Sequence, residues 1–431
     1  MDTERSVIPA IRDALVAACP VVRQASPDAD GIAGLVPVFV AFPASTEEAS
    51  ALMRVAAEHH LTVVPRGAGT GLGWGNPPSA CDLVIDLQAM DQVIEHAAGD
   101  LVARVQAGAT MRHLASVLAS AGQQIAVDAP ADATVGGVVA TGTAGPRRFR
   151  YGAPRDLLIG ITVVRADGVV AHSGGKVVKN VAGYDLGKLF AGSQGTLGLI
   201  TEVTVRLHPL PAAVAWVTGD LSARAGAAAA VTAAAGSALV PSAVELLWTD
   251  PQAVPRVGVL LEGTPSGVAE RARRMSDLLE SAGAKPAPAD VSWETVPEAG
   301  APHTVARVTF WARQLGEVLD ALAAAGESAG VRPAVSGPAG TGLLYACLDE
   351  GTDPDTAARF VRGLRDRLSG VFAAGGSGLS RGSMAVLAAP AAVRAASGAG
   401  RPVPGLHLMQ AVKDQFDPGH RMCPGRFPWE R

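Results

Sequence analysis

The sequence predicts an α+β protein of two successive domains, on three observations. Residues 33–211 mix β-branched, strand-like runs with stretches of helical periodicity, which is typical of a mixed α+β domain. Pro209 and Pro211 then interrupt this pattern, because proline cannot continue a central strand. Residues 212–402 return to strands and helices in two sets, each of the β-α-β-β-α type. The second domain is therefore expected to be ferredoxin-like, an antiparallel sheet with helices on one face.

The elements of the first domain follow from periodicity and turn signals. Apolar residues at helical spacing predict helices over 47–60 and 111–122, the latter ending at Gly122 as its C-cap. Strand-like runs occupy 61–65, 81–87, 101–108, 157–175 and 195–209. Within 157–175, Asp167 and Gly168 are a two-residue turn signal, so this run is expected to fold as a hairpin.

The second domain and the two ends of the chain are assigned in the same way. Its expected strands are 215–221, 243–248, 257–263, 307–312 and 341–350. Its expected helices are 223–237, 267–283, 313–326 and 355–368. Residues 1–32 are expected to be an N-terminal helical segment. Residues 403–431 contain a short helix at 407–417 and are expected to return to the first domain.

Composition limits the class of protein. The chain has 431 residues, of which 48% are hydrophobic and 18% charged, and its net charge of −4 gives no basis for binding nucleic acid. The N-terminal stretch lacks the basic region of a secretory signal. No window has the roughly 18 consecutive apolar residues of a membrane span. We therefore expect a cytoplasmic protein, and its attachment to the inner face of the membrane through partners stays open.

The sequence predicts no metal site. Four cysteines, Cys19, Cys81, Cys347 and Cys423, lie far apart and form no CxxC pair. This spacing excludes a zinc or iron–sulfur site built by one short segment. The nine histidines are equally scattered, without an HxH or HxxxH pair. We expect reduced thiols.

Glycine occupies every second position from Gly67 to Gly75 in the stretch PRGAGTGLGWG. A Rossmann fingerprint fails here, because Leu72 stands where GxGxxG needs its last glycine and a strand follows. A P-loop fails in GYDLGKL (183–189), where the glycine spacing is wrong and Leu189 replaces the required Ser or Thr. What remains is a loop whose backbone amides converge on an anion.

Two more glycine-rich segments occur in the same domain, ATVGGVVATGTAG (133–145) and residues 174–209. Apart from the strand-like run at 195–209, we expect the three segments to be loops. Glycine loops without a ligand weaken local packing and add chain entropy, so three of them in one domain indicate a ligand. Together they suit a long molecule, with a pyrophosphate on the first loop and a flat ring system along the others.

These segments resemble the FAD-binding, PCMH-type domain of the vanillyl-alcohol oxidase flavoproteins, which consists of two α+β subdomains. The resemblance covers roughly residues 33–211 and is carried by PRGAGTGLG, TVGGVVATGTAGPRRFRYGAPRDLLIGITVV and GKVVKNVAGYDLGKLFAGSQGTLGLITEVTVRL. The last of these is most similar to the FAD-binding subunit of bacterial glycolate oxidase, also called glycolate dehydrogenase. FDPGHRMCPGRF resembles the terminal segment of that family.

The resemblance implies FAD contacts in all three segments. Expected around the pyrophosphate are Arg66, Gly67, Ala68, Gly69, Thr70 and Gly71. Expected along the flavin and its ribityl chain are Thr134, Gly136, Gly137, Ala140 and Gly142. Expected near the adenosine are Gly195, Gly198 and Ile200. For each glycine, a turn without ligand contact is the alternative.

Two features depart from the family pattern. Some members attach FAD to a histidine near the first loop, but no histidine lies between His60 and His96, so we expect non-covalent FAD. The family's terminal segment carries Asn-Pro-Gly, whereas Cys423 precedes Pro424 and Gly425 here. A thiol is a weaker hydrogen-bond partner than an amide, which weakens the expected contact of the tail near the flavin.

The substrate side offers fewer signals. Related D-2-hydroxyacid dehydrogenases use a histidine-rich GDGN-type segment to hold a divalent metal that polarises the substrate. The stretch GTGLLYACLDEG (340–351) lacks histidine, so we expect no metal, and the catalytic residues are unassigned. Candidate polar groups, each with a surface or structural role as its alternative, are Arg307, Arg313, Arg381, Tyr345, His172, His208, Lys176 and Lys179.

The resemblance implies an FAD-binding subunit of a glycolate oxidase or dehydrogenase complex. Such a complex oxidises glycolate, a 2-hydroxy acid, to glyoxylate and relays electrons through flavin. The implied partners are a catalytic flavoprotein subunit and an iron–sulfur subunit. Two alternatives stay open: a stand-alone FAD-dependent oxidase or dehydrogenase of a hydroxy acid or alditol, and a cofactor-free scaffold subunit. The three glycine-rich segments disfavour the scaffold.

Overall fold

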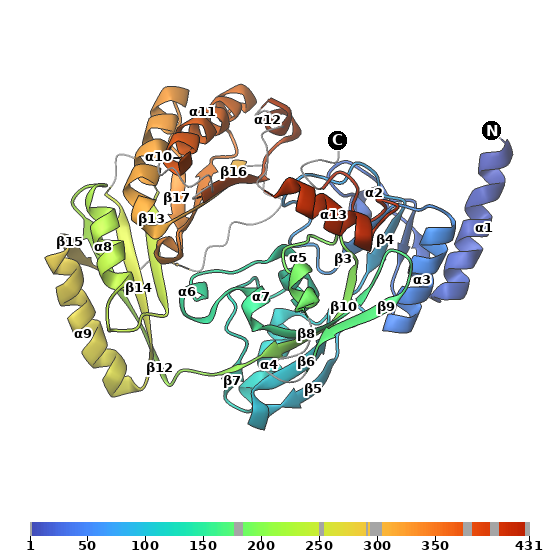
Figure 1. Ribbon diagram of the computed structural model, residues 1–431, viewed down its shortest axis with the longest axis horizontal. Helices are drawn as coiled ribbons and strands as arrows, with labels where there is room; N and C mark the ends of the chain where they lie inside the picture. The colour runs from blue at the N-terminus through green and yellow to red at the C-terminus, as the bar shows by residue number, and fades with distance from the viewer. Residues whose placement is uncertain are drawn as a thin grey trace. The chain divides into compact units, whose positions relative to one another are not determined.

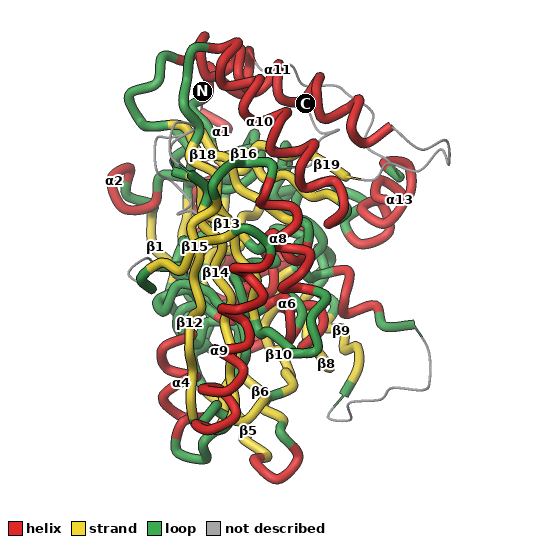
Figure 2. Tube along the Cα trace, turned by 90° about the vertical axis from the view of Figure 1, so that its left-hand side faces the viewer, coloured by secondary structure: helices red, strands yellow, loops and turns green. Residues whose placement is uncertain are grey.

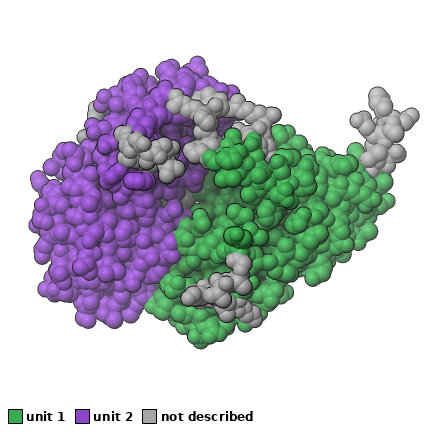
Figure 3. Space-filling model, viewed as in Figure 1, with its two compact units in different colours: residues 1–143, 153–210, 400–431 green, residues 144–152, 211–399 purple. Residues whose placement is uncertain are grey.

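The computed structural model describes residues 2–175, 184–249, 254–289, 292–293, 304–373, 382–396 and 405–426 (Figure 1). Helices and strands are mixed along the chain, which confirms the predicted α+β class (Figure 2). The chain forms two compact units (Figure 3). Unit 1 comprises residues 1–143, 153–210 and 400–431, and unit 2 comprises residues 144–152 and 211–399. The chain therefore enters unit 2 twice.

The first sheet of unit 1 is small and partly parallel, in the order β1–β2–β4–β3. Its strands are β1 (Val22–Gln24), β2 (Phe39–Ala41), β3 (Val63–Arg66) and β4 (Leu83–Asp86). β4 runs parallel to β2 and β3, and parallel strands need a crossover, which α3 (Thr46–Glu58) makes between β2 and β3. α3 begins where Ser45 Oγ accepts a hydrogen bond from Glu48 N at 3.2 Å. α1 (Asp2–Ala18) packs against α3, and α2 (Pro27–Asp30) precedes β2.

The second sheet of unit 1 is antiparallel, in the order β5–β6–β10–β8–β9. Its strands are β5 (Val93–Ala97), β6 (Val102–Gln106), β8 (Leu158–Val164), β9 (Val170–Gly174) and β10 (Leu199–Arg206). Between β6 and β8 lie α4 (Met111–Ala119), α5 (Val135–Thr141) and α7 (Pro154–Leu157). A two-stranded ribbon joins β7 (Gln123–Gln124) to β11 (His208–Pro209).

The predicted hairpin at 157–175 is present as β8 and β9, but its turn is longer than expected. Arg165 N donates to Val169 O at 3.0 Å, so Ala166, Asp167 and Gly168 form a three-residue turn. Gly168 has a φ of +80°, the left-handed conformation that closes such turns. The sequence signal located the turn and missed one of its residues.

Unit 2 contains one eight-stranded antiparallel sheet, in the order β15–β12–β14–β13–β17–β18–β16–β19. The strands are β12 (Ala213–Leu221), β13 (Ala243–Trp248), β14 (Arg256–Gly263), β15 (Ala284–Ala287), β16 (Thr304–Phe310), β17 (Ala334–Gly337), β18 (Leu343–Leu348) and β19 (Gly382–Ala388). Each half has a ferredoxin-like strand order, and the halves pair through β13 and β17.

One face of this sheet packs against helices. They are α8 (Gly226–Ala235), α9 (Pro265–Ser281), α10 (Leu315–Ala329), α11 (Pro354–Ala373) and α12 (Ala391–Ala396). Alternate strand residues such as Val244, Leu246 and Trp248 join them in one apolar core, whereas Glu245 between them faces the other way. α9 runs alongside β12 in both views (Figures 1 and 2). α6 (Arg148–Tyr151), from the first entry of the chain into unit 2, contacts β13.

The C-terminal residues contribute α13 (Leu406–Phe416) to unit 1. Among the described residues, no helix has both the length and the apolar character that a membrane crossing requires. Three candidate polar groups, Lys176, Lys179 and Arg381, lie outside the described residues.

Candidate functional site

The first glycine segment leaves β3 and passes directly over α5. A Cβ atom on Gly67 would lie 2.1 Å from Thr134 Oγ1, and one on Gly71 would lie 2.5 Å from Thr141 Cγ2. Gly69 adopts a φ of +79°, which side chains rarely allow. These positions are therefore restricted to glycine by close approach and by backbone conformation.

The second glycine segment, expected to be a loop, contains the short helix α5. Thr134 Oγ1 accepts a hydrogen bond from Gly137 N at 3.2 Å and caps the helix. A Cβ atom on Gly136 would lie 2.6 Å from Ala107 Cβ, so glycine lets α5 pack closely on its neighbour. The prediction was wrong because glycine disfavours helices in isolation, and the cap and tertiary packing outweigh that preference here.

The third glycine segment lies against the other two. Gln194 N donates to Ala140 O at 2.7 Å, near the end of α5. A Cβ atom on Gly195, whose φ is +75°, would lie 3.2 Å from Pro65 Cγ in β3. Residues 176–183 of this segment fall outside the described part of the chain.

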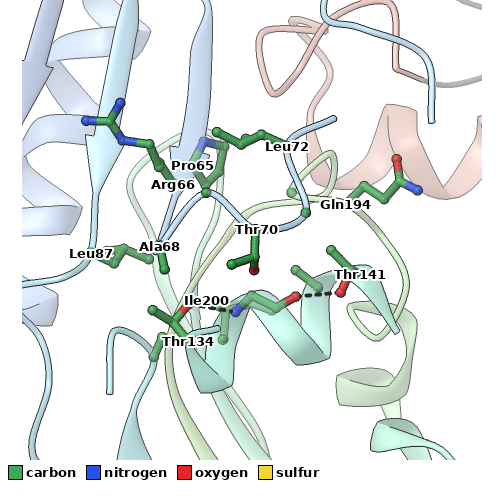
Figure 4. A pocket seen from close by; sticks show the side chains of 18 of the residues that line it. Pro65, Arg66, Ala68, Thr70, Leu72, Leu87, Thr134, Thr141, Gln194 and Ile200 are labelled. Atoms are coloured by element: carbon green, nitrogen blue, oxygen red, sulfur yellow. Dashed lines mark hydrogen bonds between the residues drawn. The ribbon is translucent and has the colours of Figure 1, made fainter. Parts of the chain in front are cut away.

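A pocket lies where the three segments meet, entirely within unit 1 (Figure 4). Its empty volume is about 720 Å³, including the space at its open mouth. Every expected site residue lines it except Gly142, which ends α5 with a φ of +67°. Residues that were not among the expected cofactor contacts also line it: Pro65, Leu72, Leu87, Ala107, Thr141, Gln194, Cys423 and Arg426.

Arg66 lines the pocket, but two buried carboxylates bind its guanidinium group. Nε donates to Asp86 Oδ2 at 2.7 Å, and Nη2 donates to Asp30 Oδ1 at 3.0 Å. Asp30 also accepts from Arg23 at 2.9 Å, and this bond holds the pKa of the Asp30 carboxyl well below its usual range. The Arg66 guanidinium points away from Thr70 in Figure 4. Arg66 therefore anchors the end of β3, and its charge is neutralised by the protein.

Arg426 is the other charged residue of the pocket lining, and it is only 7% exposed. Nη1 donates to Trp74 O at 2.9 Å and to Gln194 Oε1 at 3.3 Å, while Nη2 donates to Leu72 O. These acceptors are all neutral, and Nε is buried without a hydrogen-bond partner among the described residues. Because a buried charge without a counter-ion is costly, an anion in the pocket would stabilise this group.

The tail that carries Arg426 is fixed to unit 1 by backbone and side-chain bonds. Val63 N donates to Arg421 O at 2.8 Å, and Cys423 N donates to Val63 O at 2.9 Å, so the tail pairs with β3. Lys413 on α13 is fully buried, and its Nζ donates to Asp417 Oδ2 at 2.7 Å and to Thr196 O at 2.9 Å. The second of these bonds reaches the third glycine segment.

Cys423, where the family has asparagine, is 1% exposed and has a φ of +47°. Asparagine is the non-glycine residue that best tolerates this left-handed region, so the backbone at this position would also suit an asparagine. Cys423 lines the pocket and lies against Gly195. The tail therefore reaches the pocket despite the change.

The remaining polar candidates are dispersed. His172 Nδ1 lies 3.0 Å from Thr162 Oγ1 in the β8–β9 hairpin, and His208 is on β11. Arg313 is exposed, with its guanidinium carbon 4.9 Å from the ring centroid of Trp311. Arg307 and Tyr345 are brought together as a cross-strand pair in unit 2. Among the described residues, no group of histidine, cysteine or acidic side chains is arranged to hold a metal ion.

Comparison with known proteins points to one cofactor. Residues 37–174 match the family model described as FAD binding domain. The "Glycolate oxidase subunit GlcD" of Bacillus subtilis (strain 168) is 39% identical over 178 residues, which are 41% of this chain and 38% of that protein. The "Probable D-lactate dehydrogenase, mitochondrial" of Danio rerio is also 39% identical over 178 residues, 41% of this chain and 36% of that protein. The chain thus matches little more than a third of each relative's length.

Among solved structures, that of p-cresol methylhydroxylase with substrate bound has a TM-score of 0.74. The match covers 97% of this chain and 96% of the p-cresol methylhydroxylase chain, at 16% identity. This likeness shows the fold. The pocket fits the cofactor chemically, because it combines glycine backbone with a buried guanidinium whose partners among the described residues are all neutral. Residues 37–174 therefore match the FAD binding domain model, the chain shares the fold of the p-cresol methylhydroxylase structure, and FAD is the cofactor.

Proposed function

We propose that this protein is an FAD-dependent oxidoreductase that acts on the CH–OH group of a 2-hydroxy acid. The relatives named above are designated for glycolate and D-lactate, which are both small 2-hydroxy acids. The single observation that carries the proposal is the convergence of three glycine segments on one pocket within the FAD-binding unit. Together they favour this activity over the cofactor-free scaffold.

We propose that the expected site residues of the pocket hold FAD without a covalent bond. Gly67, Gly69 and Gly71 would let backbone N–H groups approach the diphosphate, and α5 would support the flavin side. Arg426, not Arg66, would supply the positive charge, because the Arg66 guanidinium is neutralised by Asp30 and Asp86. The absence of histidine among the described lining residues supports non-covalent binding.

Bound FAD supplies the two-electron acceptor that oxidation of an alcohol requires. The chain's own residues have three tasks in this proposal. The glycine segments position the cofactor by close backbone approach. The tail from Arg421 to Arg426 closes one side of the pocket. A separate group must bind the substrate carboxylate.

The proposal is tested with the purified full-length protein. We expect a yellow protein with flavin absorption, whose FAD is released into solution when the polypeptide is precipitated with acid. Under anaerobic conditions, glycolate or D-lactate should bleach the flavin band, whereas ethylene glycol, which lacks the carboxylate, should not. An FAD-loaded protein that no 2-hydroxy acid bleaches, alone or with its co-purified partners, contradicts the proposal.

At a finer level, we propose that the chain is the FAD-binding subunit of a glycolate-oxidising complex. Support comes from the relative designated as a glycolate oxidase subunit and from the scattered cysteines, which suit no iron–sulfur cluster within one segment. The partners would be a catalytic flavoprotein subunit and an iron–sulfur subunit. Affinity purification from the native host, with flavin and iron assays on the eluate, should recover both. Full turnover by the isolated chain would instead establish the stand-alone enzyme.

A further inference from the structure

Arg307 lies in the middle of β16, on the face of the unit 2 sheet opposite to helices α8–α11. Its neighbours Ala306 and Val308 belong to the helix-side core, so Arg307 alternates to the other face. The register places Tyr345 of β18 directly opposite, and such cross-strand pairs have Cβ atoms about 5 Å apart. Val305 and Leu343 flank the pair in a small apolar cluster that includes Tyr345.

The charge of Arg307 is not balanced. Within the part of the chain that the structure describes, Arg307 makes no ion pair or hydrogen bond, although it is half-buried. Burial lowers the pKa of its guanidinium, Tyr345 opposes this shift, and the like charge of Arg148 on α6 adds to it. Glu245 of β13 lies on the same face of the sheet, and its charge acts on Tyr345. Two arginines near each other without a shared carboxylate are stabilised when an anion binds between them.

Tyr345 provides a neutral donor beside this charge. Its side chain is only 5% exposed, and burial raises the pKa of its hydroxyl above the ordinary value. The phenol therefore stays protonated at neutral pH and can donate a hydrogen bond. An arginine with a planar fork of N–H groups, a second arginine and a hydroxyl donor form the chemistry that recognises a carboxylate.

We propose that Arg307, Tyr345 and Arg148 form a binding site for a small carboxylate anion on this face of unit 2. Arg307 donates two parallel N–H groups to the carboxylate, Tyr345 donates its hydroxyl proton, and Arg148 adds positive charge. All three residues of this anion site belong to unit 2. Its identification as the place where a 2-hydroxy acid is held by its carboxylate rests on the proposed function.

The test uses oxalate, a carboxylate that has no C–H bond to oxidise, so binding is measured without turnover. Calorimetric titration of the FAD-loaded full-length protein should show saturable binding. Arg307→Met should weaken that binding at least about tenfold, because charge-assisted hydrogen bonds are lost. Arg307→Lys keeps the charge but not the planar fork, so its affinity for oxalate should lie between those of the wild type and Arg307→Met. Tyr345→Phe should weaken oxalate binding less than Arg307→Met does. Arg313→Met is the matched control in unit 2, since that side chain is exposed.

Thermal unfolding separates an anion site from a structural role. Without oxalate, Arg307→Met should unfold at the same temperature as the wild type or higher, because an apolar side chain replaces an unpaired half-buried charge. With oxalate, the wild type should gain stability and the variant should not. A lower melting temperature of Arg307→Met without oxalate indicates a structural role and overturns the proposal.

Three other results decide the remaining points. Absence of oxalate binding, or equal binding by the wild type and Arg307→Met, overturns the anion site. Tighter binding of inorganic phosphate than of oxalate overturns its assignment to carboxylates. FAD content is measured separately on each sample. An FAD-loaded protein that does not bind oxalate therefore contradicts the anion site and leaves the proposed function unaffected. A colourless protein that cannot be loaded with FAD but still binds oxalate supports the anion site and contradicts the proposed function.

Discussion

The side chain of Lys413 has no exposed surface, and its Nζ donates to at least three acceptors among the described residues. Besides Asp417 and Thr196, its Nζ donates to Met422 O at 2.9 Å. Lys413→Met would leave the Asp417 carboxylate buried without its counter-ion, which typically costs about 3–5 kcal/mol. Urea unfolding of the two proteins should show this loss. Lys188→Met, which removes an exposed pair with Asp185, should cost less than about 1 kcal/mol. Equal effects of the two substitutions would contradict the assignment.

Gly67 is the residue at which the cofactor pocket is least tolerant of a side chain. In Gly67→Ala the new methyl group would collide with Thr134 Oγ1, and either the first segment or α5 must shift. We expect FAD affinity to fall at least about tenfold, or about 1.4 kcal/mol. Fluorescence titration of the deflavinated protein measures the change. The control is Gly99→Ala, where nothing lies within 4 Å of the added atom. Wild-type affinity in Gly67→Ala would place the FAD elsewhere.

Asp30 makes the stability of unit 1 depend on pH. Its folded-state pKa is depressed, chiefly by Arg23, and its unfolded value is about 3.9. A carboxyl of this kind contributes stability that is fully present above the unfolded pKa and is lost as pH falls through the folded pKa. The melting temperature should therefore fall below about pH 4. Asp30→Asn should be less stable than the wild type at pH 7, and its melting temperature should change less with pH. Asp132→Asn, which removes an exposed pair with Arg112, should show the same dependence of melting temperature on pH as the wild type.

At the scale of elements, the sequence predicted those whose signal is local. The helices at 47–60 and 111–122 and the hairpin at 157–175 have periodicity or turn residues of their own. The four-residue strands β15 and β17 were missed, because short strands depend on pairing with distant partners, and the longer β19 was missed as well. α5 was missed for the related reason that its helix depends on a cap and on contact with β6 and β10. Local signals thus located the surrounding helices and strands, but not α5, the helix that lines the pocket.

The C-terminal segment is an element that the pocket needs. It pairs with β3 at Val63 and contributes Cys423 and Arg426 to the lining. A chain that ends at residue 404 should therefore expose β3 and bind FAD at least about tenfold more weakly. A chain that ends at Arg426 keeps every bond described for the segment and should bind FAD normally. Arg426→Met should weaken FAD binding without unfolding the tail, since Lys413 and the backbone bonds persist. Flavin content and fluorescence titration of the three variants measure these effects.

At the scale of the whole molecule, the limits of sequence reasoning are physical. Close backbone approach leaves a mark in the sequence itself, and most of the residues that line the pocket lie in the glycine-rich segments. The sequence did not separate Arg66, whose charge Asp30 and Asp86 neutralise, from Arg426, whose partners in the described part of the chain are neutral. That difference depends on tertiary contacts between distant residues. Nor did it show that residues 144–152 leave unit 1 to join unit 2, where Tyr151 donates to Glu262.

Because each unit has its own apolar core, the two should respond to different ligands. The FAD pocket lies wholly in unit 1, so FAD at 100 times its Kd should stabilise that unit by about 2.7 kcal/mol. Calorimetric unfolding should then show two transitions, of which FAD raises one and oxalate raises the other. Gly67→Ala should cancel only the FAD shift, and Arg307→Met only the oxalate shift. If both ligands move the same transition, the cofactor pocket and the anion site do not belong to separately folding units.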